Sequence, residues 1–193
     1  MSEVFERQAP LRAAYKERPE EALARKSART STAAVPPGDP FHGEVEVGDG
    51  YGVSLRYGLD RYVGGLHDLP NPGDLLCAAL AACQDGAVRM VAELFGVELE
   101  DLEVEVTGDL DVRGTLLVDP AVRVGFEALR CRARLRPAAG ADPRMVEKLL
   151  EVAERVCVNA DTLRGGAEVT VESELAGENE EKGVAPCPSS TSR

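Results

Sequence analysis

The sequence has 193 residues, lacks tryptophan and contains only two histidines, His42 and His67. So few imidazoles argue against a His-rich metal site. The sequence also lacks an excess of basic residues, because 22 Lys and Arg face 34 Asp and Glu, giving a net charge of −12. A surface of that sign repels phosphate, so we expect no nucleic-acid partner.

Long apolar runs are missing as well. No uninterrupted run reaches the roughly 20 residues that a membrane-spanning helix needs, so we expect no membrane partner. The first fifteen residues contain no apolar segment of the kind found in secretory signals. The cysteines are odd in number: Cys77, Cys83, Cys131, Cys157 and Cys187. An odd number without a secretory signal favours free thiols in a reducing cytoplasm.

Composition divides the chain into three parts. Residues 1–40 are predicted to form a helical extension and a linker, because the Pro- and Gly-rich residues 36–40 mark a boundary. Residues 41–176 carry the regular apolar periods of a folded domain. Residues 177–193 are predicted to be a disordered acidic and polar tail.

The periods of the central part predict an α+β fold, with two long helices packed on antiparallel sheets. Alternation of apolar and polar side chains, typical of strands, occurs in residues 42–63, 102–114, 129–136 and 167–175. Apolar side chains recur every three or four positions, as in helices, in residues 74–94 and 143–156.

The predicted strand 129–136 has arginines on one face and apolar side chains on the other. We expect the arginines to form a solvated face that pairs with Glu103 and Glu105 on a neighbouring strand, with an anion-binding surface as the alternative. Cys131 lies on the apolar face and is expected to be a small core residue.

Two thiols are candidates for chemistry. Cys83 lies on the apolar stripe of the first predicted helix, among small alanines, and Cys157 lies in the last turn of the second. If the helices pack together, one thiol can attack an oxidant and the other can condense with the resulting sulfenic acid to a disulfide. Such a cycle needs a cation near the first thiol. The alternative is that both cysteines are buried core residues.

The sequence resembles the OsmC/Ohr family of osmotically inducible and organic hydroperoxide resistance proteins. Residues 71–83, Asn-Pro-Gly-Asp-Leu-Leu-Cys-Ala-Ala-Leu-Ala-Ala-Cys, are similar to the family motif in which the reactive cysteine comes last. Gly64-Gly65 precedes that motif, and residues 154–159 resemble the second cysteine motif. The resemblance covers residues 42–175.

This resemblance implies an OsmC-like fold, an intertwined homodimer with the two helices at its centre, and a pocket at the dimer interface. It implies that Cys83 attacks an organic hydroperoxide and that Cys157 resolves the product to a disulfide. The reductant would be a dithiol, dihydrolipoyl in the hydroperoxide-resistance branch. No metal or bound cofactor is expected.

The sequence departs from the family pattern around the first motif. Gly73 replaces the glutamate that holds an arginine beside the reactive sulfur. Asp74 either takes over that role or caps the helix, and capping is the favoured interpretation. Arg61 is the candidate for the arginine, an exposed strand charge being the alternative. Val158 replaces the proline that usually follows the second cysteine.

The leading hypothesis for the function is therefore a thiol-dependent peroxidase in oxidative-stress defence. The alternative is an OsmC-like small-molecule binding or redox-sensing protein with little peroxidase activity, which the change at Gly73 favours. A structural dimer with buried cysteines is the third possibility.

Overall fold

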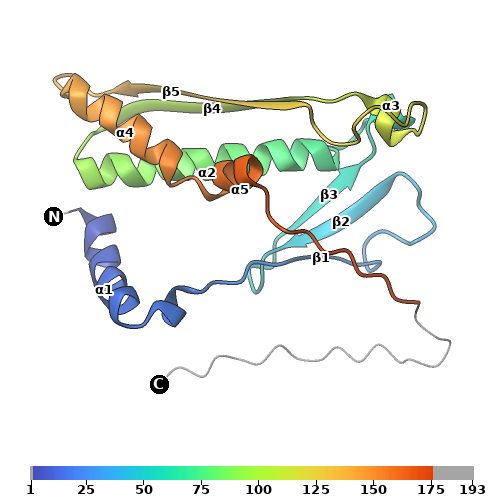
Figure 1. Ribbon diagram of the computed structural model, residues 1–193, viewed down its shortest axis with the longest axis horizontal. Coiled ribbons are helices and arrows are strands. Elements are labelled where there is room, and N and C mark those ends of the chain that lie inside the picture. Colours follow the sequence, from blue (N-terminus) through green and yellow to red (C-terminus); the bar gives the residue numbers. More distant parts are fainter. Residues whose placement is uncertain (1, 176–193) are drawn as a thin grey trace.

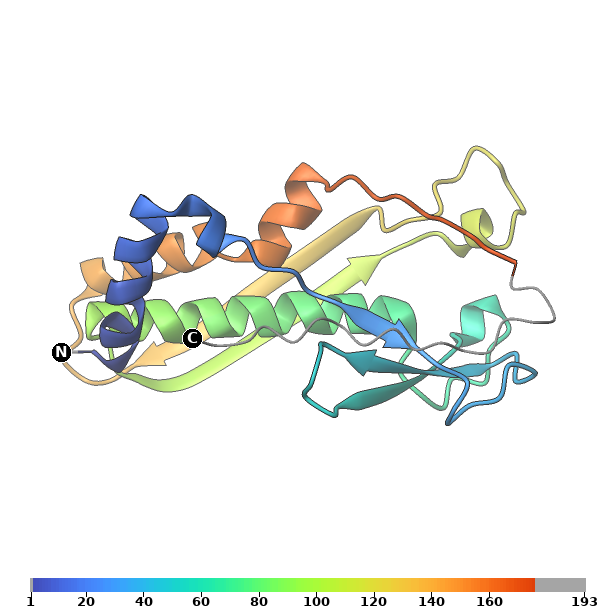
Figure 2. The same cartoon turned by 90° about the horizontal axis from the view of Figure 1, so that it is seen from below.

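The computed structural model describes residues 2–175 of the chain. One long helix runs beneath a two-stranded ribbon, further helices lie against it, and a separate three-stranded sheet lies near its N-terminal end (Figures 1 and 2). The helices are α1 (Glu3–Glu17), α2 (Pro72–Phe95), α3 (Val112–Thr115), α4 (Pro143–Arg155) and α5 (Val158–Gly165), with 3-10 turns η1 (Pro19–Ala22) and η2 (Arg61–Val63).

Both sheets are antiparallel. The first has the order β1-β2-β3, and the second pairs β4 with β5. Their strands are β1 (Ala28–Thr30), β2 (His42–Val47), β3 (Ser54–Gly58), β4 (Leu99–Asp109) and β5 (Ala128–Pro137). The predicted α+β architecture, with long helices on antiparallel sheets, is confirmed.

Helix α2 has a well-defined beginning and end. Asn71 accepts hydrogen bonds from the backbone N–H groups of Gly73 and Asp74, and the Asp74 carboxylate accepts one from the N–H of Asn71. This reciprocal capping box satisfies N–H groups that have no partner within the helix. Gly96 ends the helix with φ +67°, a left-handed conformation that glycine adopts without steric cost. The capping interpretation of Asp74 is confirmed.

The core is formed where α4 and β4 pack against α2. Leu149 of α4 is fully buried, as are Val88 and Val91 of α2 and Cys157, which follows α4. By length and composition alone α2 would pass as a membrane-spanning helix, but its packing against α4, α5 and β4 identifies it as the central helix of this domain.

The arginine face of β5 is neutralised by acidic side chains of β4. Arg134 lies 3.2 Å from Glu103 and Arg136 lies 3.1 Å from Glu100, while Arg130 pairs with Asp109. These ion pairs are exposed, so they confirm the solvated-face interpretation and contribute little stability. Of the two predicted partners, Glu103 forms an ion pair, whereas Glu105 lies opposite Arg132 in the strand register without an ion pair among the described residues.

Three predictions of secondary structure need correction. Residues 167–175 form no strand; this segment is exposed and has no strand beside it in the described chain, and alternation alone does not supply a hydrogen-bonding partner. The predicted linker contains β1, because residues 28–30 pair with the edge of β2. The strand predicted over 102–114 ends at Asp109, and α3 follows. The predicted tail, with Cys187, lies outside the described residues.

We predict that Leu149→Ala lowers the free energy of unfolding by about 2–5 kcal/mol, because it removes packed methyl groups from the contact between α4 and α2. Leu23→Ala is the matched control, since Leu23 is 84% exposed. Urea unfolding followed by circular dichroism measures both. Equal effects of the two substitutions would contradict the assignment of the core.

Candidate functional site

The structure brings Cys83 and Cys157 together. Cys83 lies on α2, half-buried, and Cys157 lies at the junction of α4 and α5, fully buried. Both thiols are free, and Cys83 lies close enough to Cys157 to influence the pKa of the Cys157 thiol. The two candidate thiols from distant parts of the sequence therefore share one site.

Burial raises the pKa of Cys157, because a thiolate is poorly solvated inside the protein. A backbone hydrogen bond with Ala160 opposes that effect, and the neighbouring Cys83 side chain raises the pKa of Cys157 further.

A backbone donor contacts the Cys83 sulfur. The backbone N–H of Asn159 donates to Cys83 Sγ at 3.5 Å. Asn159 lies in the first turn of α5, where backbone N–H groups have no partner within the helix and the helix dipole is positive. This hydrogen bond would strengthen if the Cys83 sulfur carried a negative charge.

Helix α5 is held in this position by two side-chain contacts. The Asn159 side-chain amide donates to the carbonyl oxygen of Ala79 on α2 at 2.8 Å. Arg164 near the end of α5 lies 2.7 Å from Glu154 on α4. Sequence reasoning gave Asn159 no role, although an Asn two residues after a cysteine, at the start of a helix, was the available signal.

A cavity of about 930 Å³ opens beside this site, between α2, β5 and α5. Its wall combines apolar side chains with polar ones, including Gln84, Arg130 and the Arg164–Glu154 ion pair, and neither Cys83 nor Cys157 lines it. Cys131 lines this cavity and is exposed, so the expectation that it is a core residue is wrong. Its side chain does lie on the predicted inner side of β5, but the cavity leaves that part of the strand uncovered.

Arg61 lies in η2, in a different part of the domain. Its guanidinium group is over the ring of Tyr62, 5.0 Å from the ring centre, and donates to the Tyr62 hydroxyl at 3.3 Å. Within residues 2–175 no hydrogen bond or ion pair joins Arg61 to Cys83 or to Asp74. The structure therefore brings the two cysteines together, but it does not bring Arg61 to them.

The first turn of α2 is connected to η2 by hydrogen bonds. The Asn71 side-chain amide donates to Asp60 at 2.9 Å and to Asp74 at 2.8 Å. A cavity of about 1050 Å³ lies beside this turn, and Cys77 lines it. Burial raises the pKa of Cys77, and the nearby Asp74 charge raises it further, so this thiol is poorly suited to act as a nucleophile.

Comparison with known proteins places this arrangement in a family. The family model described as OsmC-like protein matches residues 65–172. This match spans more than half of the chain and includes both Cys83 and Cys157. Among curated proteins, none matches the chain.

Several solved structures share the fold. An organic hydroperoxide resistance protein OsmC from Legionella pneumophila is 26% identical, with a TM-score of 0.53, over 74% of this chain and 91% of that one. An OsmC-like protein of unknown function from Vibrio cholerae is 15% identical, with a TM-score of 0.58, over 72% of this chain and 94% of that one. An organic hydroperoxide resistance protein from Elizabethkingia anophelis is 20% identical, with a TM-score of 0.54, over 75% and 91%. The predicted OsmC-like fold is confirmed.

Proposed function

The chain belongs to the family of OsmC-like proteins, and we propose that it is a thiol-dependent peroxidase that reduces organic hydroperoxides through Cys83 and Cys157. The observation that carries this proposal is the site of the Cys83 sulfur, which neighbours the Cys157 thiol and accepts a hydrogen bond from the Asn159 N–H. The likeness to an organic hydroperoxide resistance protein supports the choice of substrate.

The first step is a two-electron reduction of the peroxide. The Cys83 thiolate attacks the terminal oxygen of the hydroperoxide, the O–O bond breaks, and the alkoxide leaves with a proton as an alcohol. Cys83 is then a sulfenic acid. Negative charge on Cys83 before attack is stabilised by the N-terminal end of α5, so this helix supplies part of what a nearby cation would provide.

The second step uses the proximity of the two thiols. The Cys157 sulfur attacks the Cys83 sulfur, the Cys157 proton leaves with the hydroxyl group as water, and a disulfide forms. A dithiol reductant such as a dihydrolipoyl group then restores both thiols by disulfide exchange. The raised pKa of Cys157 keeps it protonated until Cys83 has reacted.

The proposed substrate is a hydroperoxide with an apolar body. The cavity beside α2 and α5 presents Leu76, Leu80 and Leu163, which favour an alkyl chain over hydrogen peroxide. We place the reaction in a reducing cytoplasm, where the free thiols can be regenerated.

The proposal includes a homodimer. Apolar side chains are exposed on both central helices and on the segment after them: Leu76, Met145, Leu150, Val158, Leu163, Val169 and Val171. A single chain leaves this surface in water, whereas a second copy packed against it would bury it.

We predict a dimer at micromolar concentration with an interface of about 2,000 Å² or more, since burial of such a surface is typical of obligate dimers. Sedimentation velocity measures the mass, and Leu76→Glu should shift the protein towards monomer by placing a charge in the interface. Arg89→Glu, which changes an exposed side chain on the same helix, is the control. A folded 20.6 kDa monomer of the parent protein would rule out the dimer.

Arg61 is proposed to support the reactive thiolate from a position closer to Cys83 than the one it takes beside Tyr62. We predict that Arg61→Ala lowers the peroxidase rate at neutral pH and lowers it much less at high pH, where the thiolate forms without help. Arg61→Lys, which keeps the charge, is the control for charge alone. Equal pH–rate profiles for the parent and Arg61→Ala would show that Arg61 does not support the Cys83 thiolate and would leave the N-terminal end of α5 as its proposed source of stabilisation.

The test of the proposed function uses the two cysteines separately. We predict that Cys83→Ser abolishes consumption of cumene hydroperoxide in the presence of dihydrolipoamide. Cys157→Ser should retain one turnover and leave a sulfenic acid on Cys83 that dimedone labels, because the resolving thiol is gone. Cys131→Ser is the matched control and should keep turnover, with a Cys83–Cys157 disulfide found by peptide mapping. Turnover by Cys83→Ser at the parent rate would disprove the assignment.

A second candidate function is small-molecule binding or redox sensing with little turnover. Two observations favour it: Gly73 replaces the family glutamate, and Arg61 is engaged with Tyr62. The same experiment separates the two functions. A sensor forms the Cys83–Cys157 disulfide once and is not recycled by the dithiol at a catalytic rate.

A further inference from the structure

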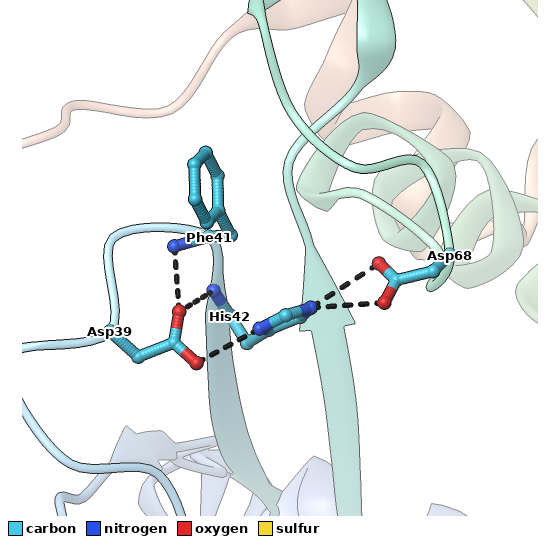
Figure 3. Close-up of polar contacts among 4 residues, drawn as sticks. All are labelled: Asp39, Phe41, His42 and Asp68. Atoms are coloured by element: carbon cyan, nitrogen blue, oxygen red, sulfur yellow. Dashed lines mark hydrogen bonds and ion pairs between the residues drawn. The ribbon is translucent and has the colours of Figure 1, made fainter.

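His42, the first residue of β2, lies between two carboxylates at a distance from the paired thiols (Figure 3). Its Nδ1 atom is 2.9 Å from Asp39 Oδ2. Its Nε2 atom is 3.1 Å from Asp68 Oδ2 and 3.3 Å from Asp68 Oδ1. The His42 side chain is only 16% exposed, so water competes weakly for these contacts.

Both carboxylates need a donor from the same ring. A neutral imidazole has one N–H and one lone pair, and only the imidazolium has an N–H on both nitrogens. The hydrogen bond with Asp39, and then that with Asp68, raises the pKa of His42, while burial opposes them. Asp39 and Asp68 are the charged groups that influence the pKa of this ring. The β3 residue that faces the ring, Gly58, carries no charge.

The two contacts differ in strength. Asp39 is fixed in place, because its other carboxylate oxygen accepts the backbone N–H groups of Phe41 and His42 at 2.8 and 3.1 Å. These bonds lower the pKa of Asp39, after the larger effect of the His42 side chain. The side chain of Asp68 is 53% exposed, against 29% for Asp39, and its distances to the ring are longer. When one proton leaves, the ring therefore keeps the N–H towards Asp39.

We propose that His42 is a pH-dependent positioning residue that, as imidazolium, fastens residues 64–70 to β2 and, once neutral, releases Asp68. In the neutral form the Nε2 lone pair faces the Asp68 carboxylate, and the contact becomes repulsive. The proton on Nδ1 stays with Asp39, so the junction of residues 39–42 is unchanged. This proposal does not depend on the proposed peroxidase function.

The segment that is released connects η2 to α2. Other backbone hydrogen bonds keep its ends in place: the Gly65 N–H donates to Asp60 at 2.8 Å, and the Gly58 N–H donates to Pro70 at 3.0 Å. The Asn71 side chain also joins the first turn of α2 directly to Asp60. Release is therefore a local loosening within residues 64–70, around Asp68, and not an unfolding of the sheet.

The sign of the pH dependence follows from the raised pKa. The contact between protonated His42 and Asp68, called the His42 tie below, contributes its full stability to the folded state below the ordinary histidine pKa of about 6.5. This stability is lost as the pH rises through the higher pKa of His42 in the folded state. The Asp39 carboxylate stays ionised well below this range because its pKa is lowered, so its hydrogen bond with His42 Nδ1 is kept at mildly acidic pH.

NMR titration of the two histidine rings tests the proposal. His42→Asn identifies the His42 signals, and His67 is the internal reference. We expect His42 to titrate above the ordinary range and, when neutral, to carry its proton on Nδ1, as read from long-range ¹H–¹⁵N correlation spectra. Asp68→Asn should shift the titration to lower pH. Asp49→Asn, which removes the same charge from the turn between β2 and β3, should shift it much less.

Amide hydrogen exchange of residues 64–70 supplies the second readout. The ratio of exchange rates between Asp68→Asn and Asp49→Asn should be well above one at about pH 6, where the tie is closed. The ratio should approach one above the His42 titration, where the tie is open in both variants. A proton on Nε2 in neutral His42, or the same titration in the parent and Asp68→Asn, would overturn the proposal.

Discussion

The packing of α4 against α2 is the contact on which the site depends. Leu149, Val88 and Val91 are buried between these helices, and Cys157 is buried directly after α4. Once this interface is closed, the chain must turn into α5 beside the middle of α2, where Cys83 lies. The relative position of the two thiols is therefore a consequence of apolar burial. The hydrophobic contact that stabilises the domain also places Cys157 beside Cys83.

The environment of Cys83 combines a half-buried sulfur with a backbone donor and a neighbouring thiol. An unpaired thiolate in such a place would be poorly solvated, but the first turn of α5 offers an N–H group and the positive end of a helix. Asn159 serves twice, through its backbone towards Cys83 and through its side chain towards Ala79. The same residue therefore holds α5 against α2 and donates the hydrogen bond that would stabilise a negative charge on the Cys83 sulfur.

The N-terminal end of α2 is organised by polar contacts instead. Asp60, Asn71 and Asp74 form a hydrogen-bonded cap, and the His42 tie lies one segment away. Among the described residues, the buried α2–α4 interface carries no titratable pair of this kind. The domain therefore combines a thiol site fixed by apolar packing with a polar end of α2, beside which the proposed His42 contact depends on protonation.

The sequence by itself determined the α+β class, the two long helices and the capping of α2 by Asp74, because periodicity and local hydrogen bonding are properties of neighbouring residues. It offered Cys83 and Cys157 as candidate thiols without showing that they meet. Tertiary structure decided the rest. Alternation in residues 167–175 predicted a strand, but a strand needs a partner that local sequence does not specify. The two cysteines meet because α4 packs against α2, and Asn159, the donor to Cys83, is 76 residues away in the sequence. Contacts between distant segments depend on how the whole chain buries its apolar surface, which no short stretch of sequence records.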